Sequence, residues 1–189
     1  MKKIFAVVFA VLCSATCSDG SLVISQYVET DSGTTPKGIE IWNPTAAAID
    51  FSTSNLQVLK GTNGGAPALD FELTSGSIAA NEVIVVGTSD IGTYLSTNGL
   101  GSVQYFEEGF TFNGDDSLVL NLGGVDVDVF GDPGNDPGSA WSGGGVETRN
   151  SNIQLLSTIA SGTTAGSSKP LSRRGAIAVT GKFGMFVKR

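Results

Sequence analysis

The sequence predicts an all-β fold, and three observations support this prediction. The chain holds 26 glycine and 6 proline residues among its 189 residues, a composition that fits many short strands joined by turns. Short runs of β-branched and aromatic residues alternate with clusters of Gly, Asn, Asp and Ser. The sequence shows no long apolar stripe with the 3.6-residue period of a helix.

Residues 1–17 have the order of a secretory signal peptide. Two lysines precede the apolar run Ile4–Cys13, and small residues follow it. This run is too short to span a bilayer and no later segment is long enough, so we expect no transmembrane segment. Cleavage after Ala15 or after Cys17 would release a secreted chain. A lipid anchor on Cys17 at the cell surface is the alternative, although the preceding residues lack the leucine of a good lipoprotein signal.

Three strands are predicted in the first part of the mature chain. Leu22–Glu29 is rich in β-branched and aromatic residues and is followed by a turn cluster. In Ile39–Trp42 the two isoleucines point to one face and Glu40 and Trp42 to the other, before an Asn-Pro pair ends the run. Ile49–Leu59 predicts a third strand with a short polar link inside it.

The next segments predict a half-exposed strand, a central strand and a helical turn. Leu69–Leu73 alternates strictly between apolar and acidic residues, as in a strand with one face in water. Glu82–Gly87 is more continuously apolar, which favours a central position in a sheet. Residues 89–100 would hold one helical turn, capped by Ser89 or Asp90.

A β-hairpin is predicted in the second half of the chain. Ser117–Leu122 and Val125–Phe130 flank a Gly-Gly pair, which is the sequence signal of a two-residue hairpin turn. In the second of these strands the valines share one face and Asp126 and Asp128 share the other. We expect the face with the aspartates to be solvated.

The C-terminal part separates into a last strand of the domain and a tail. Ile153–Leu156 predicts a short strand, and the Gly/Thr/Ser-rich residues 161–168 are typical of a linker. Ala176–Val179 predicts a last strand or a loosely packed tail. The expected organisation is therefore a signal peptide at 1–17, a folded domain at 22–156 and a tail at 157–189.

Charge divides the chain at the same point. Residues 18–156 hold three basic residues against 18 acidic ones, a net charge of −15, whereas residues 157–189 hold six basic residues and no acidic one. Nucleic-acid binding depends on Lys and Arg that neutralise phosphates, so we expect no nucleic-acid partner for the acidic body. We expect the basic tail to neutralise the body, with an anionic surface as its alternative target.

Three motifs in order resemble the lamin-tail domain of bacterial secreted proteins. They are the strand Ile39–Asn43, the turn Phe112–Asp116 and the loop from Gly131 to Trp141. The residues that carry the resemblance are Glu40, Trp42, Asn43, Asn113, Gly114, Asp115, Asp116, Asp136, Pro137, Gly138 and Trp141. The resemblance covers residues 22–156 and implies an immunoglobulin-like β-sandwich of about seven to nine strands.

The resemblance also implies a function class. It implies a secreted, non-enzymatic interaction module that acts in the extracellular space or at the cell surface, with a protein or a glycan as its partner. Some relatives are fused to secreted nucleases or phosphatases, and this chain shows no such catalytic partner. A carbohydrate-binding or calcium-dependent adhesion domain is the alternative, because a fold does not by itself name a ligand.

Residue types also favour a non-enzymatic protein. The chain has no histidine, and both of its cysteines lie in residues 1–17. The usual base of a Ser or Cys nucleophile, a His-ligated zinc and a disulfide are therefore missing from the folded domain. Paired carboxylates remain for a glycosidase. However, Glu107 and Glu108 lie beside Gly109 in a predicted loop, and Asp126 and Asp128 lie on an open strand face with no sign of an apolar pocket.

Calcium is the cofactor that the sequence leaves open, although we expect none. Asp115, Asp116, Asp132 and Asp136 would supply oxygen ligands, but the pattern lacks the spacing of an EF-hand. We expect these side chains to bond nearby backbone amides, with Gly114 at positive φ. Trp141 is expected to be a buried anchor and Trp42 the more exposed tryptophan.

Overall fold

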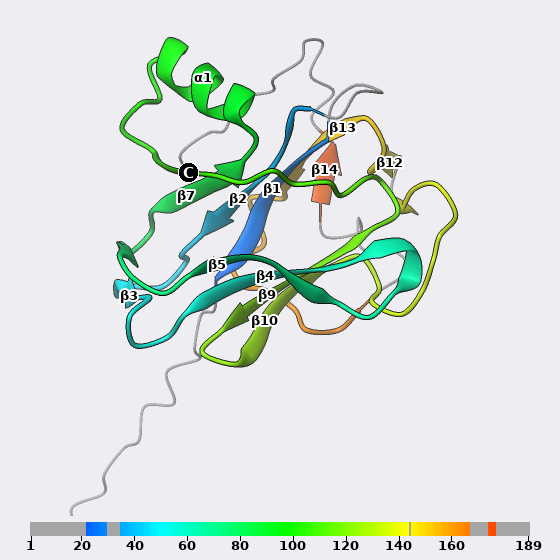
Figure 1. Cartoon of the computed structure of the whole chain (residues 1–189), viewed down its shortest axis with the longest axis horizontal. Coiled ribbons are helices and arrows are strands. Elements are labelled where there is room, and N and C mark those ends of the chain that lie inside the picture. The colour runs from blue at the N-terminus through cyan, green and yellow to red at the C-terminus, as the bar shows by residue number, and fades with distance from the viewer. Residues whose placement is uncertain (1–21, 30–34, 144, 167–173, 177–189) are drawn as a thin grey trace, which may run out of the picture.

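The fold is an all-β sandwich, as predicted. The computed structural model describes residues 22–29, 35–143, 145–166 and 174–176, shown in colour in Figure 1. Two main sheets, one of six strands and one of four, lie face to face. The predicted signal peptide and Cys17 lie outside the described residues. Within them, no helix combines the length and the apolar character needed to cross a membrane.

The larger sheet has the order β14-β13-β1-β2-β7-β8 and is antiparallel except at its last pair. β7 and β8 run parallel, which requires a crossover, and the helix α1 (Ser89–Thr97) supplies it. The strands of this sheet are β1 (Val23–Glu29), β2 (Lys37–Trp42), β7 (Val83–Gly87), β8 (Gln104–Glu107), β13 (Ser151–Leu155) and β14 (Arg174–Ala176).

The smaller sheet is antiparallel throughout, with the order β10-β9-β4-β5. Two short strand pairs, β3 with β6 and β11 with β12, and the 3-10 turn η1 complete the fold. The bounds of these elements are β4 (Leu56–Gly61), β5 (Ala68–Leu73), β9 (Ser117–Leu122), β10 (Val125–Phe130), β3 (Ile49–Asp50), β6 (Ser77–Ile78), β11 (Ser142–Gly143), β12 (Val146–Glu147) and η1 (Thr62–Gly64).

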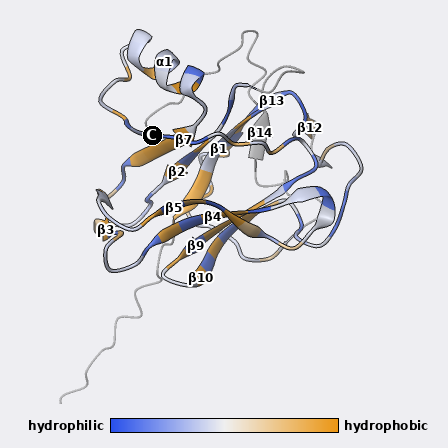
Figure 2. Ribbon diagram, in the orientation of Figure 1, coloured by the Kyte–Doolittle hydropathy of each residue, from blue (hydrophilic) through white to orange (hydrophobic). Residues whose placement is uncertain are grey.

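The core lies between the two sheets. Ile39 and Ile41 are fully buried and point into it, as their alternation predicts. Tyr27 of the larger sheet stacks on Phe130 of the smaller one, with ring centroids 4.6 Å apart. Figure 2 shows apolar residues along β1 and β7 and on the strands of the smaller sheet. Burial of these side chains between the layers holds the sandwich together.

The structure corrects two predicted elements. Ile49–Leu59 is not one strand, because Asp50 accepts hydrogen bonds from the Ser52 amide (2.8 Å) and hydroxyl (2.6 Å). This turn separates β3 from β4 and sends them to different sheets. The helical segment spans Ser89–Thr97, which is more than one turn, and its N-cap is Thr88 rather than Ser89 or Asp90.

The main sheets together hold ten strands, above the range of about seven to nine expected for an immunoglobulin-like sandwich. The sequence did not predict β8, because in its four residues two adjacent aromatics lie between Gln104 and Glu107, with no β-strand alternation. β14 begins two residues before the predicted last strand, Ala176–Val179, and pairs with β13. Residues 177–179 lie outside the described part of the chain.

Two further predicted elements agree with the structure. β7 lies between β2 and β8, and each of its residues is buried, as expected for a central strand. The Gly-Gly pair forms the hairpin turn between β9 and β10, with φ of 59° at Gly123 and 86° at Gly124. Both residues thus adopt the left-handed conformation of a two-residue hairpin, which glycine favours.

Candidate functional site

Two regions contain candidate functional residues. The first is one end of the sandwich, where the loops after β4 and β10 meet those before β9 and β13; we call it the loop end. The second is the side of the sandwich formed by the edge strands β5 and β8, which we call the open side. The loop end carries most of the residues that the sequence singled out.

At the loop end, the turn Asn113–Asp116 is held by the carboxylate of Asp116. Its two oxygens accept hydrogen bonds from the Asn113 amide (3.1 Å) and the Asn63 amide (3.0 Å). The Asp116 amide in turn donates to the Asn113 carbonyl (3.2 Å). Asp116 is therefore a structural turn residue, as the sequence predicted.

Trp141 anchors the adjacent loop and is 1% exposed. Its indole Nε1 donates to the Asp116 carbonyl (3.2 Å), and its amide donates to Thr148 Oγ1 (2.9 Å). The Thr148 hydroxyl donates in turn to the Gly114 carbonyl. The predicted role of Trp141 as a buried anchor is confirmed.

Gly114 serves this turn in a different way from the one predicted. It is not among the glycines at positive φ. A Cβ atom at this position would lie 2.7 Å from Cα of Arg149, which is backbone and cannot move aside easily. Gly114 is therefore required for a close approach of two chain segments.

The calcium candidates are engaged in local contacts. Gly138 donates its amide to Asp136 Oδ1 (2.7 Å), and the Asn135 side chain donates to Asp132 Oδ2 (3.3 Å). Burial raises the pKa of Asp115 above its usual range, and the negative charges of Asp116 and Asp136 raise it further. The structure thus brings Asp115, Asp116 and Asp136 near one another. Among the described residues, no group of three or more acidic side chains has the arrangement of a metal site.

A buried ion pair at the same end was not recognised from the sequence. Glu29 and Lys37 face each other across β1 and β2, with 3.3 Å between Oε1 and Nζ, and both side chains are almost inaccessible. Burial raises the pKa of Glu29, and the attraction of Lys37 opposes this rise. The only sequence signal for this ion pair is that the two residues lie on either side of a predicted turn. Residues in such positions can pair across adjacent strands.

The motif Ile39–Asn43 has a structural role. Glu40 is buried and accepts a hydrogen bond from the Ser25 hydroxyl (2.6 Å). The fully buried Asn43 ends β2, and its side-chain amide donates to the carbonyls of Ala47 (2.8 Å) and Ala79 (3.0 Å). Trp42 is half-buried, and it is the more exposed of the two tryptophans, as predicted.

The side of the sandwich at β10 is closed by hydrogen bonds. Asp128 was expected on a solvated face, but it is fully buried and accepts hydrogen bonds from the amides of Ile24 and Thr163, each at 2.9 Å. The Val129 amide donates to the Thr163 carbonyl (2.8 Å). A register shift between Asp126 and Asp128 turns Asp128 inward. Residues 162–163, in the segment predicted as a linker, therefore cover the edge of β10.

The opposite side is open. Phe71 of β5 and Phe106 of β8 lie 6.1 Å apart between ring centroids, so the two edge strands lie on the same side of the sandwich. Within the described part of the chain, the backbone of β5 bonds only to β4, and β8 pairs only with β7. Leu69 of β5 is 55% exposed. The outward-facing amides and carbonyls of these strands are thus available to a partner.

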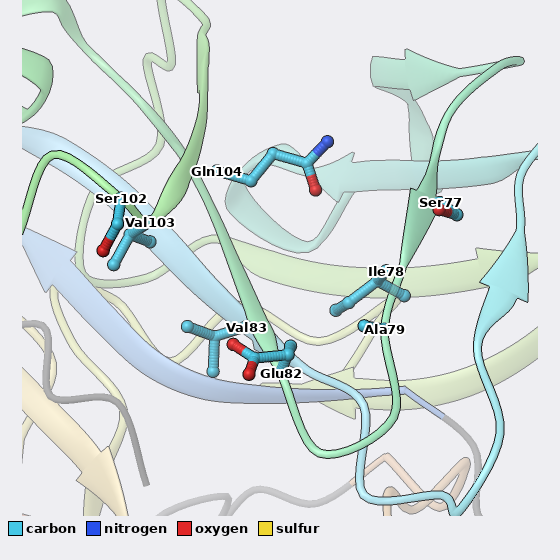
Figure 3. Close-up of a pocket in the computed structure, with 8 residues that line it drawn as sticks. All are labelled: Ser77, Ile78, Ala79, Glu82, Val83, Ser102, Val103 and Gln104. Carbon is cyan, nitrogen blue, oxygen red and sulfur yellow. The ribbon is translucent and has the colours of Figure 1, made fainter.

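A pocket of about 200 Å³ lies between β6 and the starts of β7 and β8. In Figure 3, residues 102–104 lie on one side of it and residues 77–79 on another, with Glu82 and Val83 between them. The lining combines the hydroxyls of Ser77 and Ser102 and the amide of Gln104 with aliphatic side chains. No sequence motif marked this pocket, because it depends on how β6 and β8 pack together.

Comparisons with protein-family models, with curated proteins and with solved structures find no match to this chain.

Proposed function

We propose that this protein is a secreted or cell-surface interaction module that binds a protein partner along its open side. The observation that carries the proposal is the difference between the two sides of the sandwich. β10 is covered by residues 162–163, whereas β5 and β8 keep outward-facing backbone groups. An uncovered edge strand is a template for pairing with another chain.

Two further features of β5 support binding. Leu69 is among the few large apolar side chains exposed on the described surface, and it lies on this edge. The pocket beside β6 and β8, the second edge strand of the open side, offers a recess for one side chain of a partner. Apolar side chains and small recesses at a binding surface supply affinity and specificity.

The sequence supports the location and class in this proposal. The charged, apolar and small-residue order of residues 1–17 favours export. The resemblance to lamin-tail domains favours a non-enzymatic module. A lipid anchor on Cys17 would place the same module on a membrane surface rather than free in solution.

Glycan binding is the second candidate, and the pocket favours it. Hydroxyl and amide groups above an aliphatic floor suit a sugar ring as well as a peptide side chain. Gln104→Ala should then abolish glycan binding and leave a protein partner bound to β5. Soluble oligosaccharides that shift the amide resonances of Gln104 but not those of β5 would favour this candidate over the first.

The proposed function is tested by capture of exported proteins on the immobilised native chain, Leu69→Lys and Val125→Lys. Val125 is a matched control, since it is 64% exposed but is the first residue of β10, at the hairpin tip. We expect a partner, identified by mass spectrometry, that the native chain and Val125→Lys retain and Leu69→Lys loses. Equal capture by all three proteins would place the binding surface elsewhere.

A further inference from the structure

We propose that the partner of the open side is an extended, basic segment of another protein that adds as a strand to β5. This inference rests on the proposed function and names the chemistry of the partner. In strand addition, main-chain hydrogen bonds supply affinity and alternate side chains supply specificity. The side chains of β5 therefore predict what the added strand must carry.

The register of β5 places an apolar and an acidic residue on the same outer face. Leu69 pairs with Leu59, and Glu72 pairs with Gln57 of β4. Because residues 57 and 59 are two apart in an undistorted strand, their side chains share a face. A register shift on β5 leaves Asp70 without a partner on β4. Because of this extra residue, Leu69 and Glu72 lie on the same face although they are three positions apart.

Glu72 is positioned to receive a cation. Its Oε1 accepts hydrogen bonds from the side-chain amides of Asn55 and Gln57, each at 2.7 Å. These amides fix the exposed carboxylate without neutralising its charge. A Lys or Arg side chain on a neighbouring strand would form a charge-assisted hydrogen bond there.

Asp70 adds to the negative charge of this edge. Its Oδ1 lies 3.9 Å from Lys60 Nζ, and no donor from the described residues reaches its buried Oδ2. Pairing of two copies of β5 would bring Asp70 and Glu72 of both copies together, and like charges across a strand pair repel. The edge therefore disfavours a second copy and selects a cationic strand. The net charge of −15 over residues 18–156 acts in the same direction at long range.

The sequence pattern expected of the partner follows from Leu69 and Glu72, which share one face of β5. Side chains that alternate along the added strand should place an aliphatic residue beside Leu69 and a lysine or arginine beside Glu72. On an undistorted strand these two residues are separated by one position. An extended segment that alternates aliphatic and basic residues on one face meets this requirement.

The test uses synthetic peptides of about nine residues, the length of a long strand. In the first peptide, valine and lysine alternate along one face of the strand, and threonine occupies every position of the other face. A second replaces each lysine by glutamate, and a third is the lysine peptide with N-methyl groups on alternate amides, which removes their hydrogen bonds. Affinity is measured by calorimetry on the full native chain, and the site by amide chemical shifts.

Three variants accompany the peptides. Glu72→Gln keeps an acceptor for Asn55 and Gln57 but removes the charge, and Glu72→Lys reverses it. Asp126→Lys is the matched control, because Asp126 is also an exposed acid that accepts a side-chain amide, from Asn121 at 2.8 Å, but it lies on β10.

We expect the lysine peptide to bind the native chain with shifts in β5, and the glutamate and N-methyl peptides not to bind. Glu72→Gln should weaken binding by about tenfold and Glu72→Lys should prefer the glutamate peptide, whereas Asp126→Lys should bind as the native chain does. Equal binding of the N-methyl peptide, equal loss in Asp126→Lys, no binding of the lysine peptide or dimerisation of the native chain through β5 would overturn the inference. If Leu69-dependent capture of a partner persists while the lysine peptide fails, only the inference fails.

Discussion

The two sides of the sandwich differ in whether other described residues cover the backbone of their edge strands. At β10, the Val129 amide donates to the Thr163 carbonyl and the Asp128 carboxylate accepts from the Thr163 amide, so residue 163 covers this edge. At β5, an exposed leucine and two acidic residues lie beside backbone groups that no described residue covers. The covered side contributes to stability, and the uncovered side is the one to which we assign the proposed binding.

Asp128 illustrates the difference most clearly. On β10 and β5 the acidic residues appear alike in sequence, since both strands alternate acidic and apolar residues. A register shift turns Asp128 inward, where it joins the start of β1 to residue 163. A shift in β5 instead keeps Glu72 exposed on the outer face. The local bulge, rather than the residue type, decides which carboxylate becomes structural.

The largest predicted effect concerns Trp141. Its loop leads to β11 and β12, and β12 lies next to β14 on the closed side. Trp141→Ala should lower the free energy of unfolding by about 3–5 kcal/mol, because a fully buried indole and its hydrogen bond to Asp116 are lost. Chemical denaturation measures this change. An unchanged midpoint would contradict the role of Trp141 as an anchor.

Asp128→Ala should destabilise the closed side by about 2–4 kcal/mol, because two backbone amides lose a charged acceptor. The amides of Ile24 and Thr163 should then exchange with solvent faster than in the native chain. The matched change on the open side, Glu72→Ala, should alter stability by less than about 0.5 kcal/mol, since Glu72 is exposed. Equal losses in both variants would remove the distinction between the sides.

Acidification should stabilise the protein mildly. The pKa values of Asp70, Glu29 and Asp115 are raised, first of all by burial. A carboxyl group whose folded-state pKa lies above its unfolded value favours folding when protonated, so its contribution is lost as pH rises through the folded pKa. The melting temperature should therefore rise as pH falls from neutral into the range of these raised values. Asp70→Asn should reduce this rise, and a steady fall in melting temperature would contradict the assignment.

The smallest predicted effect concerns calcium at the loop end. Asp116, Asp132 and Asp136 accept hydrogen bonds within their own turns. Millimolar CaCl₂ should therefore raise the melting temperature no more than NaCl of equal ionic strength, because both salts screen the acidic body. A rise specific to calcium that disappears in Asp136→Asn would show that a cation site exists there.

Much of the fold could be predicted from the sequence, because alternation and turn residues act locally. Leu22–Glu29, Ile39–Trp42 and the Gly-Gly hairpin appear within about two residues of their predicted positions. The turn Asn113–Asp116 and the anchor Trp141 were predicted for the same reason. The prediction fails where tertiary contacts decide the outcome, as for the inward turn of Asp128 and the division between β3 and β4.

The candidate binding side could not be predicted from residue patterns. Leu69–Leu73 was recognised as a half-exposed strand, but nothing in the sequence shows which neighbours a strand will have. β8 has only four residues, so its pattern is too short to predict. Its parallel pairing with β7 and the contact of Phe106 with β5 depend on the crossover at α1. An open side is a property of sheet order, which is set by long-range pairing.

Amide hydrogen exchange, resolved by residue, tests the distinction between the two sides most directly. We expect slow exchange for the Val129 and Thr163 amides on the closed side. The amides of β5 that do not bond to β4 should exchange fast in the free protein and become protected when the lysine and valine peptide is added. Protection of these β5 amides in the free protein, or exchange that the peptide leaves unchanged, would contradict an open side that binds by strand addition.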